Sequence, residues 1–159
     1  MTDARFEDGA ERALRLRAEA IEDIAVLSAL VQDAVLPASE MRYDSGRRRF
    51  ALLINRFRWE DRSAAERQNR PYERVQSLLV VNDVTAAATH GFDRRDADTV
   101  LSILAMSFEP GEDGTGALVL TLAGDGALRL KVECLDVTLQ DATRPYIAPS
   151  RHAPDHPQD

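Results

Sequence analysis

The residues best suited to chemistry or binding lie in one arginine-rich segment that also carries aromatic side chains. The stretch ALLINRFRWED, residues 51–61, begins as an apolar run and turns into alternating arginine and aromatic residues. Guanidinium groups bind phosphates and carboxylates through paired donors, and aromatic rings can stack on bases. The candidate binding surface consists of Arg56, Arg58, Trp59, Arg62, Arg67, Arg70 and Tyr72.

The charge of this segment differs from that of the rest of the chain. Between Arg42 and Arg74 there are ten arginines and five acidic residues, a local balance of +5, whereas the whole chain has a net charge of −7. Residues 47–74 could therefore bind nucleic acid or another anion. The alternative is a solvated strand edge whose arginines pair with neighbouring acids. In that case Arg56 and Arg58 lie where the apolar face of the strand leaves the core.

An acidic loop, GFDRRDAD, is the second place where chemistry could occur. Asp93, Asp96 and Asp98 follow His90 closely, and carboxylates so spaced could ligate a hard cation in a small metal-dependent enzyme. Residues 93–98 lack the glycine and closing glutamate of a calcium loop, however. A solvated loop between strands is the alternative that we favour, and we predict no cofactor.

The remaining nucleophiles and ligands give weaker signals. His90, His152 and His156 have no paired spacing on one regular element, so they predict no metal site. Cys134 is the single cysteine, which excludes an intramolecular disulfide. It shares the parity of Leu128, so we expect a thiol packed in the core, although an approaching histidine could activate it. The catalytic residues, if there are any, are not identified.

Two kinds of periodicity indicate the elements that must position these residues. The sequence EAIEDIAVLSALVQDAV places apolar residues at helical spacing and predicts one long amphipathic helix from Glu19 to Val35. Beyond it the period becomes two, and residues 41–57 predict a hairpin that turns at Asp44, Ser45 and Gly46. Further strands are predicted within residues 75–84, 99–108, 117–124 and 127–139. In the last of these, the apolar parity changes near Cys134 and Leu135, which predicts a β-bulge.

These elements predict an α+β fold. Counting residues 13–17 as a first strand, we expect a mainly antiparallel sheet of about seven strands, curled in a barrel-like way, with the long N-terminal helix against one face or end. Residues 1–12 and the proline-rich residues 143–159 have the composition of flexible tails, which leaves residues 13–142 as a single domain.

Four stretches together indicate a family. The succession VLSALVQDAVL, RRRFALLINRFRWE, GFDRRDADTVLSILAMSFEPGE and LRLKVECLD resembles a family of short alphaproteobacterial proteins catalogued as a domain of unknown function. The likeness extends from about Leu14 to Asp141. It implies a bacterial cytoplasmic protein, and it brings no activity, cofactor or catalytic residue.

Three functions follow from this sequence. The first is a non-enzymatic binding or interaction domain, with a protein partner or self-association favoured. The alternatives are nucleic-acid or anion binding through residues 47–74 and a small metal-dependent enzyme using residues 93–98. An apolar signal-peptide core is missing from the N-terminal sequence and no run approaches about 18 apolar residues, so we expect a soluble cytoplasmic protein rather than a membrane protein.

Overall fold

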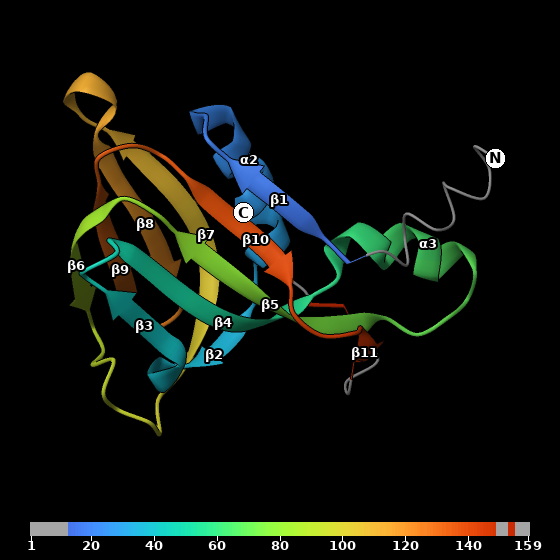
Figure 1. Cartoon of the computed structure of the whole chain (residues 1–159). Coiled ribbons are helices and arrows are strands. Elements are labelled where there is room, and N and C mark those ends of the chain that lie inside the picture. The colour runs from blue at the N-terminus through green and yellow to red at the C-terminus, as the bar shows by residue number, and fades with distance from the viewer. Residues whose placement is uncertain (1–12, 149–152, 155–159) are drawn as a thin grey trace.

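The computed structural model of the protein describes residues 13–148 and 153–154, and strands dominate this part of the chain (Figure 1). The described residues contain eleven strands, which form one antiparallel sheet in the order β1-β10-β5-β4-β2-β7-β8-β9-β6, with β3 added to β4 and β11 added to β5. The strands are β1 (Arg15–Ala18), β2 (Val35–Pro37), β3 (Met41–Asp44), β4 (Arg49–Phe57), β5 (Glu73–Val81), β6 (Val84–His90), β7 (Val100–Pro110), β8 (Gly116–Leu122), β9 (Gly126–Val132), β10 (Val137–Asp141) and β11 (Tyr146–Ile147).

The short strand β2 joins two halves of this sheet. Val35 pairs with Asn55 of β4, and residues 35–37 pair with residues 100–102 of β7. In Figure 1, β8 and β9 lie behind β4 and β5, so the two halves form two layers. Along the strands of both layers, every second side chain points inward, and the apolar ones build one core. This core includes Phe50, Leu52, Ile54, Leu79, Leu118, Leu120, Leu128 and Leu130. The sheet is not closed, since its path ends at β1 and β6.

The predicted long helix is wrong. Helix α2 spans Ile21–Val31, which is 11 residues. The helix begins after Ala20, whose N–H donates to the Asp23 carboxylate at 3.3 Å. It ends before Asp33, because the φ of 64° at Asp33 lies in the left-handed region. Val35 is therefore a strand residue. The predicted apolar face is present, because Ile24, Leu27 and Val31 are buried.

The second α-helix, α3, spans Arg62–Arg67 and was not predicted. Three single 3₁₀ turns are η1 (Ala38–Glu40), η2 (Trp59–Asp61) and η3 (Glu112–Gly114). The α+β layout of about seven strands and one long helix is thus wrong: the described residues form mainly sheet, with two short α-helices. The antiparallel pairing of the strands is confirmed.

One hairpin predicted from the strand pattern is confirmed, and the predicted bulge is wrong. Strands β3 and β4 pair with Asp44 opposite Arg49, as the hairpin predicts. The bulge near Cys134 and Leu135 is wrong, because β9 ends at Val132 and β10 begins at Val137 between β1 and β5, in the other half of the sheet. The change of parity marks the passage between two layers.

The described residues do not test the division into one domain with two tails. Tyr146 and Ile147 pair with Arg74 and Glu73 of β5, so these two residues beyond position 142 lie on the sheet. Residues 1–12, 149–152 and 155–159, with His152 and His156, lie outside the described residues. Across the described ranges, no helix has the length and apolar character needed to span a membrane.

Candidate functional site

The predicted binding surface lies where β4 and β5 are joined. These strands pair over eight positions, from Phe50 opposite Val81 to Phe57 opposite Arg74. Residues 58–72 connect them, and this connection is far longer than the usual hairpin loop of about two to five residues. It folds into η2 and α3 and extends away from the sheet in Figure 1. We call residues 58–72 the α3 arm.

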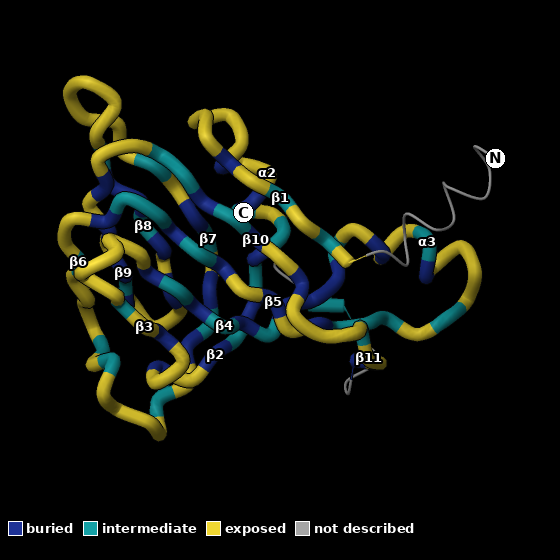
Figure 2. The backbone as a smooth tube through the Cα atoms, in the orientation of Figure 1, coloured by how far each residue is buried: buried dark blue, intermediate teal, exposed yellow. Residues whose placement is uncertain are grey.

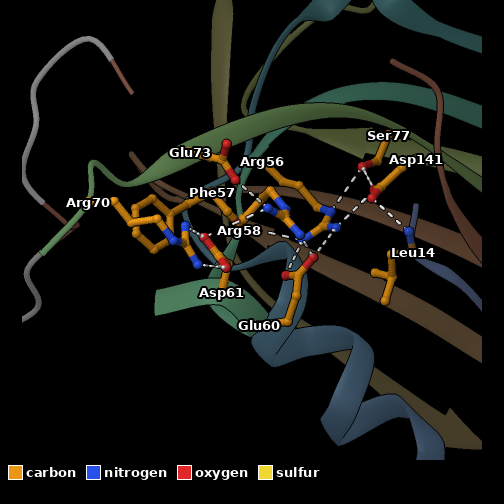
Figure 3. A network of polar contacts seen from close by, with 10 residues as sticks. All are labelled: Leu14, Arg56, Phe57, Arg58, Glu60, Asp61, Arg70, Glu73, Ser77 and Asp141. Atoms are coloured by element: carbon orange, nitrogen blue, oxygen red, sulfur yellow. Dashed lines mark hydrogen bonds and ion pairs between the residues drawn. The ribbon is translucent and has the colours of Figure 1, made fainter. Parts of the chain in front are cut away.

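Arg56 is fully buried at the base of this arm (Figure 3). Its Nη1 and Nη2 donate to the two carboxylate oxygens of Glu60, both at 2.8 Å, and Nη2 also donates to Asp141 at 2.8 Å. Its Nε donates to Ser77 Oγ at 2.9 Å, and Ser77 in turn donates to Asp141 at 2.7 Å. The other Asp141 oxygen accepts the Leu14 N–H at 2.8 Å. The cluster thus connects the arm with strands β4, β5 and β10.

Arg56 has no donor left for a ligand. A guanidinium has five N–H groups, and the fifth here reaches the Phe57 carbonyl at 3.4 Å. Burial disfavours the charged form of Arg56, but the hydrogen bonds and charges of Glu60 and Asp141 outweigh it and raise its pKa. The side chain is therefore a paired internal cation that holds strands and arm together.

Arg58 and Arg70 form further ion pairs at the base of the arm. Arg58 is 3% exposed and forms an ion pair with Glu73, and its Nη1 lies 3.7 Å from Asp61. Arg70 forms two hydrogen bonds of 2.8 Å with the carboxylate of Asp61, which is itself buried. Paired contacts of this geometry are the strong form of an arginine–carboxylate interaction.

Phe57, Trp59 and Tyr72 form an aromatic cluster at the base of the arm. The ring centres of Phe57 and Trp59 are 4.6 Å apart, and those of Phe57 and Tyr72 are 5.6 Å apart. The Trp59 indole donates to the Gln32 carbonyl at 2.9 Å, so the arm is tied to the residue that follows α2. The guanidinium of Arg62 lies 5.9 Å from the Trp59 ring centre.

Glu66 links α3 to the last residue of the arm. Its carboxylate accepts the Tyr72 hydroxyl at 2.6 Å and the Arg62 Nε at 3.3 Å. The hydrogen bond from Tyr72, followed by that from Arg62, lowers the pKa of Glu66. The same contact raises the pKa of Tyr72.

The seven predicted residues share one neighbourhood but differ in exposure. Arg56 and Arg58 are buried, whereas Arg62 and Arg67 are exposed; Trp59, Arg70 and Tyr72 are intermediate. Their role in binding stays a prediction. Sequence reasoning missed Ser77 and Asp141, although a signal existed: each is a polar residue on a strand face whose other buried positions are apolar.

The carboxylates of Asp93 and Asp96 in the acidic loop are hydrogen-bonded to other residues of the same segment. Arg95 bonds both oxygens of Asp93, and Asp96 accepts the Thr99 hydroxyl and the Asp98 N–H. Within the described ranges, no three histidine, cysteine or acidic side chains are placed to hold a metal ion.

The predicted core thiol is wrong, because Cys134 is exposed after the end of β9. Its Sγ lies 3.0 Å from the Asp83 carboxylate. That hydrogen bond, with partial burial, raises the pKa of Cys134 to about 11. The thiolate is therefore disfavoured at neutral pH.

Fold and site together define an antiparallel β protein with a buried arginine–carboxylate network beneath a projecting arm. The chain belongs to the family described as Protein of unknown function (DUF2948), whose model matches residues 14–156. The expected membership of a family of unknown function is thereby confirmed. No curated protein and no solved structure matches the chain.

Proposed function

We propose that the protein is a non-enzymatic interaction domain that binds an acidic surface of a partner protein through the exposed side of the α3 arm. The observation that supports it best is the arm's construction. Buried ion pairs fix its base, while Arg62 and Arg67 on α3 face solvent. A bacterial cytoplasmic location is part of the proposal, and the single cysteine fits a reducing compartment.

Preorganisation is the physical advantage of such an arm. A flexible loop would lose conformational entropy on binding, whereas a loop already held by side-chain contacts loses less. Arginine is also enriched at protein interfaces, where its planar group pairs with carboxylates. Arg56 and Arg58 would position the arm in this proposal, and Arg62 and Arg67 would contact the partner.

Binding of nucleic acid through residues 47–74 has less support. Much of the segment's positive charge is compensated in the fold, since Arg48 pairs with Glu133 and Arg56 with Asp141, two acids from outside the segment. Arg47 lies 3.8 Å from Asp44 in the same hairpin. The metal-dependent enzyme has less support as well, because Asp93 and Asp96 are engaged within their own loop.

The test is affinity capture from bacterial cytoplasm at low and moderate salt, with protein and nucleic acid both identified. A protein partner should be retained by the wild type and lost by the double variant R62E/R67E. The matched control is R42E/R47E, which changes two exposed arginines of the β3–β4 hairpin and should retain the partner. Each double variant also removes one exposed ion pair, Arg62–Glu66 or Arg47–Asp44, so both should show only a small decrease in melting temperature.

Two results would contradict the proposal. A partner bound equally by R62E/R67E would show that the arm is not the contact. Retention of nucleic acid that both double variants lose, and that weakens steeply with salt, would favour the nucleic-acid alternative.

A further inference from the structure

Arg94, in the loop that joins β6 to β7, is held in place by an aromatic ring. It is half-buried, and its guanidinium carbon lies 5.4 Å from the ring centre of Phe50, which is fully buried on β4. A cation over the face of a ring is attracted to it. No described residue accepts a hydrogen bond from Arg94 or forms an ion pair with it. The five N–H donors of this guanidinium are therefore available to a ligand.

Arg94 lines a groove of about 530 Å³, together with Met41, Thr89, Asp93 and Arg95. Figure 1 shows the β6–β7 loop at the lower end of the molecule, and Figure 2 shows most of this loop as exposed. Thr89 is exposed, and within the described ranges its hydroxyl has no hydrogen-bond partner. Ligand sites commonly have volumes of about 300–1,000 Å³, so this groove can hold a small molecule.

The charges that line the groove leave one cation uncompensated. Asp93 is the only acid among the described lining residues, and Arg95 donates to its two carboxylate oxygens at 3.1 and 3.0 Å. The pKa of Asp93 is lowered, with the hydrogen bond from the Arg95 side chain as the largest cause and the charge of Arg94 as the smallest. Asp93 is therefore compensated by Arg95, and Arg94 supplies the surplus positive charge.

The other two acids of the loop do not line the groove. Asp96 accepts the Thr99 hydroxyl at 2.7 Å and the Asp98 N–H at 3.1 Å, and neither Asp96 nor Asp98 belongs to the described lining. The sequence pattern directed attention to the carboxylates of this loop as ligands of a cation. In the structure the side chain without a polar partner is Arg94, and the ligand that it selects is an anion.

A phosphate monoester fits these donors better than a carboxylate does. Arg94, Arg95 and Asp93 together give the groove one net positive charge, so an ion with two negative charges is attracted about twice as strongly as one with a single charge. A phosphate monoester carries a charge of about −1.5 to −2 at pH 7 and has three acceptor oxygens. Two of these oxygens match the paired donors of a guanidinium, and the third remains for the Thr89 hydroxyl.

We propose that the groove at Arg94 binds a small phosphate monoester. Arg94 bonds two oxygens of the phosphate, the Thr89 hydroxyl donates to the third, and the organic group occupies the rest of the groove beside Met41. Because Phe50 already keeps the guanidinium in position, little side-chain entropy is lost on binding. The site lies outside the α3 arm and does not depend on the proposed protein partner.

The test is a titration of the isotope-labelled full chain with phenyl phosphate, followed by NMR. The Nε–Hε signal of Arg94 and the backbone amide signals of residues 89–95 should shift and saturate at millimolar concentration. Inorganic phosphate should bind more weakly because it lacks the organic group. Benzoate, which has the ring but a single negative charge, should also bind more weakly than phenyl phosphate at the same ionic strength.

Variants of the loop test the roles of its charges, with the amide signals as the measurement. R94Q should weaken binding of phenyl phosphate about tenfold or more, because it removes charged donors. R94K should lie between R94Q and the wild type, because lysine keeps the charge without the fork. The matched control is R67Q, which neutralises an exposed arginine of the α3 arm and should bind as the wild type does.

D93N keeps the test decisive should R94Q fail to fold. It removes the only acid of the described lining and releases Arg95, so it should bind phenyl phosphate more tightly than the wild type. A gain in affinity cannot arise from a loss of structure.

Three outcomes overturn the proposal. The first is an Arg94 signal that does not move at millimolar phenyl phosphate, which would leave Arg94 as a cover over Phe50. The second is equal binding by R94Q and R67Q, or a D93N variant that binds no more tightly than the wild type. The third is a single-stranded oligonucleotide that shifts the Arg94 signal at micromolar concentration while phenyl phosphate does not, because the groove would then bind a nucleic-acid backbone.

Discussion

Arg56 and Asp141, which are 85 positions apart in the sequence, form a buried ion pair of 2.8 Å. Strand β5 lies between their strands, and Ser77, directly opposite Asp141 on β5, hydrogen-bonds to both side chains. Arg56, Ser77 and Asp141 thus form a row of hydrogen-bonded side chains across three neighbouring strands. It therefore fixes their relative register at the end where the α3 arm begins.

Arg56→Met should destabilise the protein strongly. The substitution leaves the carboxylate of Asp141 buried with its main cation removed, and breaking such a pair costs about 3–5 kcal/mol. Urea unfolding followed by circular dichroism measures the change in the free energy of unfolding. Arg56→Lys should also destabilise, because lysine cannot reproduce the five-donor fork.

A double variant isolates the coupling between the two charges. Arg56→Met combined with Asp141→Leu removes both charges, so its loss of stability should be smaller than the sum of the single losses. Additive losses, or a cost below about 1 kcal/mol for Arg56→Met, would contradict a structural role for the pair.

Tyr72→Phe should raise the pKa of Glu66 toward its usual value of 4.5, because the Tyr72 hydrogen bond is the largest cause of the lowering. A carboxyl whose pKa is lowered in the folded state stabilises the folded state above pH 4.5. This contribution to stability is lost as the pH falls through the lowered pKa. In the wild type the loss should occur at lower pH than in the variant. NMR titration of the carboxyl carbon measures the shift, and Arg62→Gln, which removes the nearby positive charge, should also raise the pKa of Glu66.

Gly116→Ala should destabilise the β7–β8 pairing. A Cβ at this position would lie 2.4 Å from the Phe108 ring and 2.6 Å from the Glu109 carbonyl oxygen. The ring can turn but the main chain cannot, so overpacking should cost about 1–3 kcal/mol. Thermal unfolding measures it. Adding Phe108→Leu should restore only part of the loss, and a full recovery would show that the backbone contact is unimportant.

Alternation of apolar residues predicted much of the sheet, and its failures have physical causes. Phe50, Leu52 and Ile54 line the core as their parity requires. The helix was predicted too long because its apolar spacing continues to Ala34, which is buried after the chain has turned at Asp33. Strand β6 was missed because its alanines give almost no apolar alternation.

The residues of the predicted binding surface lie in one neighbourhood, but the sequence did not predict the environment of its arginines. The alternation of the strand placed Arg56 on the same face as Ile54. Because Arg56 is charged, we expected the buried part of that face to end there. The side chain is buried because Asp141 comes from β10, which reaches it through long-range strand order. Local sequence does not encode such a pairing, although a carboxylate at the inward end of an apolar strand is a signal for a buried partner.

Asp83→Asn should make Cys134 more reactive toward iodoacetamide near neutral pH. The hydrogen bond with Asp83 is the largest cause of the raised pKa of about 11, compared with 9.0 for an ordinary thiol here. Burial and the charges of Asp136 and Glu133 also raise the pKa, so the variant should recover only part of the shift. Because a less basic thiolate is also less nucleophilic, the rate at pH 8 should increase by at most about tenfold. The wild-type rate should keep rising with pH up to about 11, whereas the variant rate should level off at lower pH. Glu133→Gln is the matched control, because Glu133 is the smallest contributor to the shift. Identical pH–rate profiles for the wild type and Asp83→Asn would show that the Asp83 contact does not control the thiol.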